Sequence, residues 1–121
     1  MEMVVRGIMA EEEFAAYFAD FSWPWYMPAP EEYEALLAGQ SFAGIEVRLV
    51  HVDYRFPDAE RFAGWIEQPS LVPFLGHLPA GKARCMRDSV VERMLAACAR
   101  PDGTYGETFE RLDVKASRPA F

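Results

Sequence analysis

Hydrophobic side chains at helical spacing mark the first part of the chain. Residues 1–9 form a short apolar-rich helical segment, and three glutamates follow at 11–13, where negative charge favours the start of a helix. Four aromatic residues then recur at positions i, i+3, i+4 and i+7, namely Phe14, Tyr17, Phe18 and Phe21. This spacing predicts a helix with one buried aromatic face. The run SWPWYMPAP at 22–30 contains three prolines, which exclude a regular helix there.

A second helical pattern begins at Pro30, because proline suits the first position of a helix. Its apolar stripe consists of Tyr33, Leu36 and Leu37. We expect the helix to end at Gly39, since glycine readily takes the left-handed conformation that closes a helix.

Strict alternation of apolar and polar residues predicts two strands. The first runs from Ile45 to Phe56, and its apolar phase changes between Leu49 and Val50. A β-bulge, or a strand that changes the layer on which it packs, would explain this change. The second strand is predicted from about Thr108 to Ala116, with an inward face of Leu112, Val114 and Ala116.

Helical patterns fill the interval between the two strands. Pro57 and Asp58 open a helix that ends at Pro69 and has a buried stripe of Phe62, Trp65 and Ile66. The run LVPFLGHLP at 71–79 is a proline-rich connection to the next helix. A longer helix is expected from Ala80 to Arg100, and its buried side carries Met86, Val90, Met94 and Ala97.

These elements predict an α+β fold in a single domain that spans residues 1–121. Its helices would pack on an antiparallel two-stranded ribbon, with a helical insertion between the strands. A ribbon of two strands is marginally stable alone, and open strand edges invite pairing with another chain. We therefore expect a homodimer that completes the sheet, because closed two-fold dimers are the commonest assembly.

Composition and charge narrow the class of partner. The net charge of −7 disfavours binding to nucleic acid and to anionic membranes. The first ten residues do not resemble a signal peptide, and no run approaches the ~20 apolar residues of a membrane span. Cys85 and Cys98 lie on one predicted helix, too far apart to form a disulfide, and are expected to be packed core thiols. Free thiols suit a cytoplasmic protein.

Candidate catalytic chemistry is sparse. His51 and Asp53 share the polar face of a strand, where they could form an acid/base pair or a solvated face. Cys85 has basic neighbours that could lower its pKa. The sequence contains no glycine-rich phosphate loop, dinucleotide fingerprint or metal-ligand spacing. We therefore assign no catalytic residue, no cofactor-binding residue and no metal ligand.

The aromatic segment between prolines is the most informative local feature. Its rings, Trp23, Trp25 and Tyr26, could line a small-molecule pocket or plug one end of the core. We take these three residues, together with Trp65, as candidates for a substrate pocket.

Four motifs, in order, resemble a known family. They are FSWPWYMPAPEEY at 21–33, the leucine pair at 36–37 followed by Phe42, FAGWI at 62–66 and RLDVKASRP at 111–119. Together they resemble the C-terminal half of class I S-adenosylmethionine-dependent methyltransferases, in the small-molecule subgroup that includes trans-aconitate methyltransferase. The resemblance covers about residues 10–119, but Ser41 stands before Phe42 where the family usually has glycine.

The resemblance implies that the predicted strands are the last two of the family's sheet and that the intervening helices cap the substrate. It also implies that the aromatic segment lies near the mouth of the active site. The family's cofactor-binding half, with its glycine-rich loop, has no counterpart in this sequence. We therefore expect a non-catalytic dimeric binding domain that binds no S-adenosylmethionine alone. The alternatives are the C-terminal subunit of a split methyltransferase, whose cofactor site a partner chain supplies, and an unrelated small-ligand-binding module.

Overall fold

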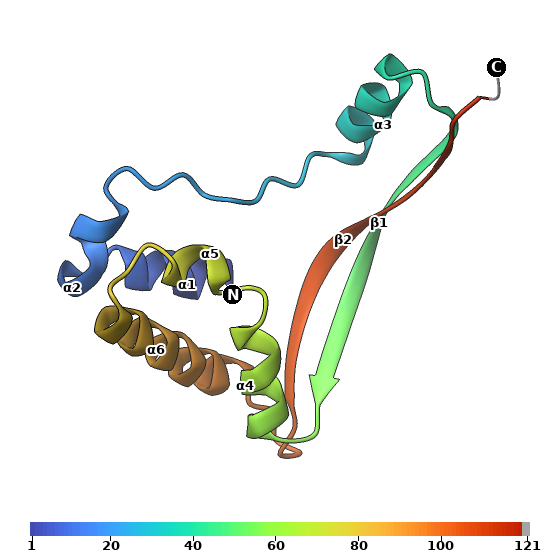
Figure 1. Cartoon of the computed structure of the whole chain (residues 1–121). Coiled ribbons are helices and arrows are strands. Elements are labelled where there is room, and N and C mark those ends of the chain that lie inside the picture. The colour runs from blue at the N-terminus through green and yellow to red at the C-terminus, as the bar shows by residue number, and fades with distance from the viewer. Residues whose placement is uncertain (120–121) are drawn as a thin grey trace. The chain divides into compact units, whose positions relative to one another are not determined.

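The computed structural model describes residues 1–119 as an α+β protein with six α-helices and a two-stranded antiparallel sheet (Figure 1). The order along the chain is α1 (Glu2–Met9), α2 (Glu12–Ala15), the 3-10 helix η1 (Ala16–Phe18), α3 (Pro30–Gly39), β1 (Ala43–Phe56), α4 (Ala59–Glu67), α5 (Val72–Leu75), α6 (Ala80–Cys98) and β2 (Tyr105–Ser117). The α+β class predicted from the sequence is therefore confirmed.

The chain divides into two compact units. One consists of Met1–Pro24 and Tyr54–Glu107, and we call it the helical unit. The other consists of Trp25–Asp53 and Thr108–Phe121, described here as far as residue 119, and we call it the ribbon unit. The helical unit holds α1, α2, η1, α4, α5 and α6, whereas the ribbon unit holds α3 and most of both strands.

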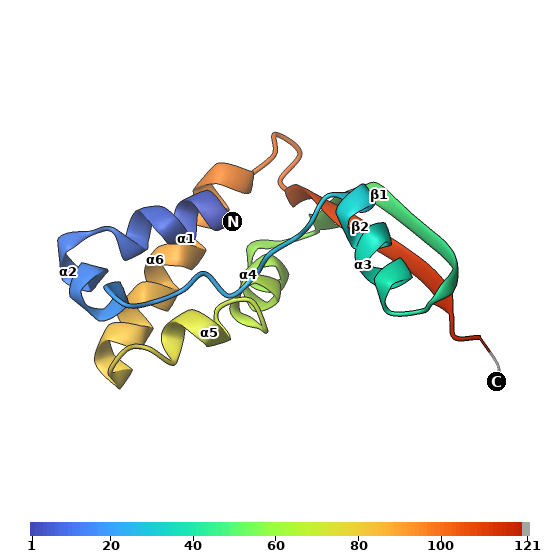
Figure 2. The ribbon, with the colours of Figure 1, turned by 90° about the horizontal axis from the view of Figure 1, so that it is seen from above.

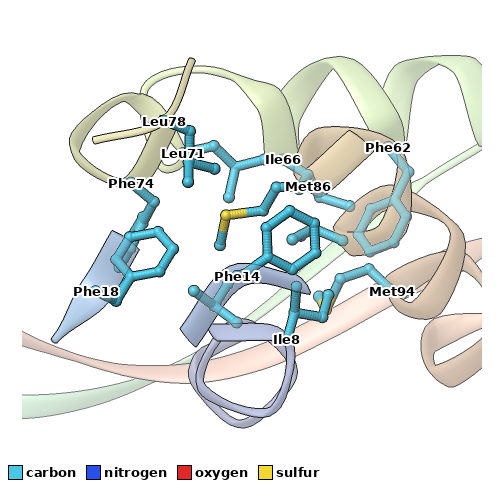
Figure 3. Close-up of a cluster of buried hydrophobic side chains, with 12 residues drawn as sticks. Ile8, Phe14, Phe18, Phe62, Ile66, Leu71, Phe74, Leu78, Met86 and Met94 are labelled. Atoms are coloured by element: carbon cyan, nitrogen blue, oxygen red, sulfur yellow. The ribbon is translucent and has the colours of Figure 1, made fainter. Parts of the chain in front are cut away.

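The helical unit is built around one apolar core, in which α6 contacts α1, α4 and α5 (Figure 2). The side chains of this core converge from all of the unit's helices (Figure 3). Its buried members are Val5, Ile8, Phe14, Phe18, Phe62, Ile66, Leu71, Phe74, Leu78, Met86, Val90 and Met94. Every buried apolar side chain among residues 1–119 belongs to this unit.

The aromatic pattern near the N-terminus is partly borne out. Phe14 and Phe18 are buried and Phe21 is half-buried, but Tyr17 is exposed. The expected helix is broken into α2 and the tighter η1, and side chains three residues apart eclipse in a 3-10 turn. Tyr17 does not join the buried aromatic face that the α-helical spacing predicts.

Helix α4 agrees with its sequence signals. The Asp58 carboxylate accepts a hydrogen bond from the backbone N–H of Arg61 at 2.8 Å, as an N-cap residue does. Phe62 and Ile66 are buried, and Trp65 is half-buried.

The proline-rich connection at 71–79 contains a short helix that the sequence analysis did not predict. Residues Val72–Leu75 form the short helix α5, and Leu71 and Phe74 are buried in the core. Pro73 lies in the first turn, where proline does not interrupt a helix, so its presence did not exclude one.

Helix α6 is present where the sequence predicts the longest helix, but it ends at Cys98 instead of Arg100. Met86, Val90 and Met94 are buried as expected. Ala97 is exposed, whereas Leu95 and Cys98 of the last turn pack against the core.

Helix α3 ends differently from the sequence prediction. Gly39 remains helical, and Ser41 takes the left-handed conformation with φ of 66°. The N–H of Ser41 donates to the carbonyl of Ala38 at 3.2 Å, and the N–H of Phe42 donates to the carbonyl of Leu37 at 3.3 Å. These two bonds form a Schellman motif whose left-handed position is Ser41.

Both strands are longer than predicted, since β1 begins at Ala43 and β2 spans Tyr105–Ser117. The phase change within β1 is confirmed, because the half-buried positions are Ile45 and Val47 before it and Val50 and Val52 after it. The predicted inward face of β2 is incompletely covered. Leu112 and Ala116 are half-buried, and Val114 is exposed.

Candidate functional site

Two of the four candidate pocket residues pack against the core of the helical unit. The Trp23 ring lies 5.1 Å from that of Phe74, and the guanidinium of Arg6 lies 3.9 Å above the Trp23 ring. The Trp65 ring lies 5.2 Å from Phe56, at the other end of α4 from its N-cap. Both side chains are half-buried, and both add aromatic packing to the core.

The other two candidates belong to the ribbon unit and are exposed. Trp25 has 45% of its surface exposed and Tyr26 has 77%. The Tyr26 hydroxyl donates to the Glu32 carboxylate, with oxygen–oxygen distances of 3.0 and 2.9 Å. This hydrogen bond, together with the negative charge of Glu32, raises the pKa of Tyr26. It also ties the proline-rich segment to the first turn of α3.

The apolar side chains of the ribbon unit are incompletely covered within the described chain. In α3, Leu36 is 59% exposed, and Tyr33 and Leu37 are half-buried. In the strands, Leu49 is 40% exposed and Val114 is 43% exposed. We call this set the ribbon surface; it also includes Ile45, Val47, Val50, Val52, Phe109 and Leu112, all half-buried.

The ribbon surface differs from the scattered apolar residues that are normal on a protein exterior. Within residues 25–53 and 108–119 no side chain is buried. The apolar stripe of α3 and the apolar positions of both strands are therefore all at least partly exposed to solvent. Because the alternation of β1 changes phase between Leu49 and Val50, the apolar strand positions lie on both faces of the ribbon. Exposed apolar surface of this kind marks interaction sites in folded proteins.

A polar cluster on the ribbon involves His51. Its Nδ1 atom lies 3.5 Å from a carboxylate oxygen of Glu110 on the neighbouring strand. The two residues also line an open hollow with Val52, Asp53, Thr108 and Phe109. The sequence predicted only that His51 and Asp53 share a face. Glu110 was missed, because the register between two strands cannot be seen in the alternation of either one.

The two cysteines differ in exposure. Both are free thiols; Cys85 is exposed and Cys98 is half-buried against the core. The expectation that Cys85 is a packed core thiol is therefore wrong, because its position on α6 faces solvent. Partial burial, followed by the nearby charge of Glu107, raises the pKa of the Cys98 thiol.

Acidic residues at the start of α2 make long-range ion pairs to α6. Glu11 bonds to Arg93, and a carboxylate oxygen of Glu13 lies 3.1 Å from the Lys82 ammonium. The sequence explained these glutamates by the helix dipole alone. Their partners lie 82 and 69 residues away, a separation that no local pattern can reveal.

His77 lies at the edge of the core. Its ring meets that of Phe21 edge-on, with centroids 4.6 Å apart. Across residues 1–119, no cluster of three or more metal-ligating side chains is present. Within the same residues, no helix has both the length and the apolar character needed to cross a bilayer.

No family model and no curated protein matches this chain. The geometry of the described residues is therefore the basis for a proposed function, and its leading feature is the ribbon surface.

Proposed function

We propose that this chain is a methyltransferase-like, non-catalytic binding domain that works as a homodimer. The observation that carries the proposal is the contrast between the two units. The helical unit buries twelve apolar side chains, whereas the apolar residues of the ribbon unit stay exposed or half-buried. A two-stranded ribbon is marginally stable when neither of its faces is covered. A second copy of the chain that covers the ribbon would bury its apolar side chains and so stabilise it.

The dimer would complete the sheet. Each strand of the ribbon has one hydrogen-bonded neighbour in the two-stranded sheet, so each has an open edge. Strands of a second copy satisfy such an edge with main-chain hydrogen bonds and cover the adjacent apolar side chains. The exposed rings of Trp25 and Tyr26 then remain available as the binding element, for a small molecule or a protein partner.

Sizing combined with a cofactor titration tests this function. Light scattering during gel filtration should give about twice the chain mass of 13.7 kDa. Calorimetric titration of the purified chain with S-adenosylmethionine should release no binding heat. A catalytically complete methyltransferase measured in parallel would show that the titration detects the cofactor. Saturable cofactor binding by this chain alone would contradict the proposal.

A second candidate rests on the same open ribbon together with the resemblance over residues 10–119. In this alternative, a separate cofactor-binding chain occupies the ribbon surface, and the two chains form a split methyltransferase acting on a small molecule. It predicts a neighbouring reading frame that encodes a glycine-rich strand–loop–helix half. Mixing the two chains should then give a one-to-one complex that binds S-adenosylmethionine, with the homodimer displaced.

The third candidate is a ligand-binding module of unrelated origin, favoured by the exposed aromatic rings near Trp25. It predicts that an apolar ligand quenches tryptophan fluorescence in a saturable way. Substitution of Trp25 by alanine should abolish that quenching, whereas a variant at the exposed Val72 should leave it unchanged.

A further inference from the structure

The open edge of β2 has a charge pattern that fits a second copy of itself. Arg111 and Asp113 point to the same side of the strand, and their side chains are joined by a 2.8 Å bond. Phe109 and Lys115 occupy the same side by alternation, and Leu112 occupies the other. The sequence on one side therefore reads aromatic, basic, acidic, basic.

Two identical antiparallel strands related by a two-fold axis place one residue opposite its own copy. Residues equally far before and after that central residue then face each other, and each such pair occurs twice. With Leu112 at the centre, Arg111 faces Asp113 of the second copy and Phe109 faces Lys115. The first is an opposite-charge pair and the second a cation–aromatic pair, both favourable across strands.

Neighbouring registers on β2 are poorer. Centring on Arg111 or on Asp113 sets two like charges directly opposite each other, which is destabilising. Centring on Val114 pairs Asp113 with Lys115, but the strand ends at Ser117, so only residues 111–117 can oppose one another. The Leu112 register uses residues 107–117 and leaves no charge opposite a like charge.

The open edge of β1 is less regular. Gly44 has a positive φ of 60°, which interrupts the extended backbone near the start of the strand. The alternation also slips between Leu49 and Val50, and such a slip disturbs a continuous ladder. From residue 107 to 117, β2 has no glycine and no positive φ, so it offers the longer uniform edge.

We propose that two copies of the chain pair antiparallel along β2, with Leu112 on the two-fold axis, to form a four-stranded sheet. This inference rests on the proposed homodimer and adds its edge and its register. The Leu112 side chains meet at the axis, and Glu110 packs beside Val114 of the second copy. The order of strands is then β1, β2, β2 and β1 across the assembly.

Charge exchange tests the pairing. In the Arg111→Asp variant, the new aspartate of each copy faces Asp113 of the other, so two repulsive pairs replace two attractive ones. The variant should raise the dimer dissociation constant at least about tenfold. The double variant Arg111→Asp with Asp113→Arg restores both pairs and should return the constant to within about threefold of the original. Arg84→Asp makes the same change of net charge at an exposed position of α6 and should have little effect.

Thiol cross-linking tests the register. In a background where Cys85 and Cys98 are replaced by serine and alanine, Leu112→Cys should give a covalent dimer under mild oxidation. Two residues on the axis face each other directly, at a distance a disulfide can span. Val114→Cys should give none, because its two copies lie about 13 Å apart along the strands.

The outcomes separate this inference from the proposed function. A chain that is monomeric at all concentrations would refute both. A stable dimer that tolerates Arg111→Asp would refute the β2 register and leave the homodimer intact. A dimer that cross-links through Val114→Cys but not Leu112→Cys would likewise refute only the register. Circular dichroism of each variant confirms that a loss of dimer is not a loss of fold.

Discussion

Ser41 holds a backbone conformation that its own side chain disfavours. Its φ of 66° lies in the left-handed region, where residues with a Cβ atom are strained, while Gly39 two positions earlier stays helical. Placing glycine at position 41 and a residue with a Cβ atom at position 39 should therefore stabilise the end of α3. Ser41→Gly is expected to raise the free energy of unfolding by about 0.5–1 kcal/mol.

The companion variant Gly39→Ala distinguishes the observed helix end from the one that the sequence suggested. No atom lies within 4 Å of a Cβ built at Gly39, so alanine fits there and should also stabilise, by about 0.4–1 kcal/mol. Urea denaturation followed by circular dichroism measures both changes. Destabilisation by Gly39→Ala would mean that Gly39, and not Ser41, takes the left-handed conformation.

The two thiols should react at different rates. Burial raises the pKa of Cys98, so its reactive thiolate forms at higher pH than an ordinary cysteine's, and the side chain is also half-covered. At pH 8 the Cys85→Ser variant, which keeps Cys98, should alkylate several-fold more slowly than the Cys98→Ala variant, which keeps the exposed Cys85.

The sign of the pH effect follows from the same shift. The folded state holds the Cys98 proton more tightly than the unfolded chain, so its contribution to stability is present below the ordinary thiol pKa and is lost as pH rises above it. The alkylation rate of Cys98 should therefore continue to rise with pH beyond about 8.5, the value for a free thiol. An alkylation rate of Cys98 that levels off by about pH 8.5 would contradict this assignment.

At the scale of elements, one large-to-small substitution in each unit should cost very different amounts of stability. Phe62 is fully buried in the helical unit, and Phe62→Ala should cost about 3–5 kcal/mol of stability through lost contacts and a residual cavity. Leu36 lies on the exposed face of α3, and Leu36→Ala should cost less than about 0.5 kcal/mol in dilute, monomeric protein.

Denaturant titrations at two protein concentrations measure this contrast. At a concentration where the dimer forms, Leu36→Ala should also weaken association, because Leu36 belongs to the ribbon surface that the second copy covers. A cost for Leu36→Ala as large as that for Phe62→Ala in the monomer would show that α3 is buried within a single chain.

Most helices and strands could be predicted from the sequence, because the spacing of apolar residues within each one is typical of a helix or of a strand. The alternation at Ile45–Phe56 and the heptad-like stripe of α6 predicted strand and helix correctly, and Asp58 marked a real N-cap. The misses have physical causes. Helix α5 is short and starts at a proline-rich run, and the break after α2 depends on tertiary packing that local spacing does not record.

The candidate site was less predictable than the fold. The sequence named Trp23, Trp25, Tyr26 and Trp65 as aromatic residues of interest, but their exposure depends on which neighbours cover them. The Trp23 ring packs against Arg6 and Phe74, which belong to other elements, whereas the Tyr26 hydroxyl donates a hydrogen bond to Glu32. The ribbon surface was anticipated in outline, since two strands alone were expected to need a partner.

At the scale of the whole molecule, burial is unevenly distributed. One unit contains the entire buried apolar core of the described chain, and the other carries α3 and a ribbon whose apolar side chains are exposed or half-buried. Stable interfaces bury about 1,200–2,000 Å² in total and have apolar centres with polar rims. The ribbon surface, with its apolar strand positions beside Arg111, Asp113 and Lys115, has the composition of such an interface.

Hydrogen–deuterium exchange at two protein concentrations tests most directly whether a second copy covers the ribbon surface. At high concentration, alternate amides of the ribbon unit should become protected, and this protection should vanish on dilution below the dissociation constant. Amides of α6 in the helical unit should exchange equally at both concentrations. Concentration-independent exchange throughout residues 25–53 and 108–119, in protein that is folded at both concentrations, would contradict the account.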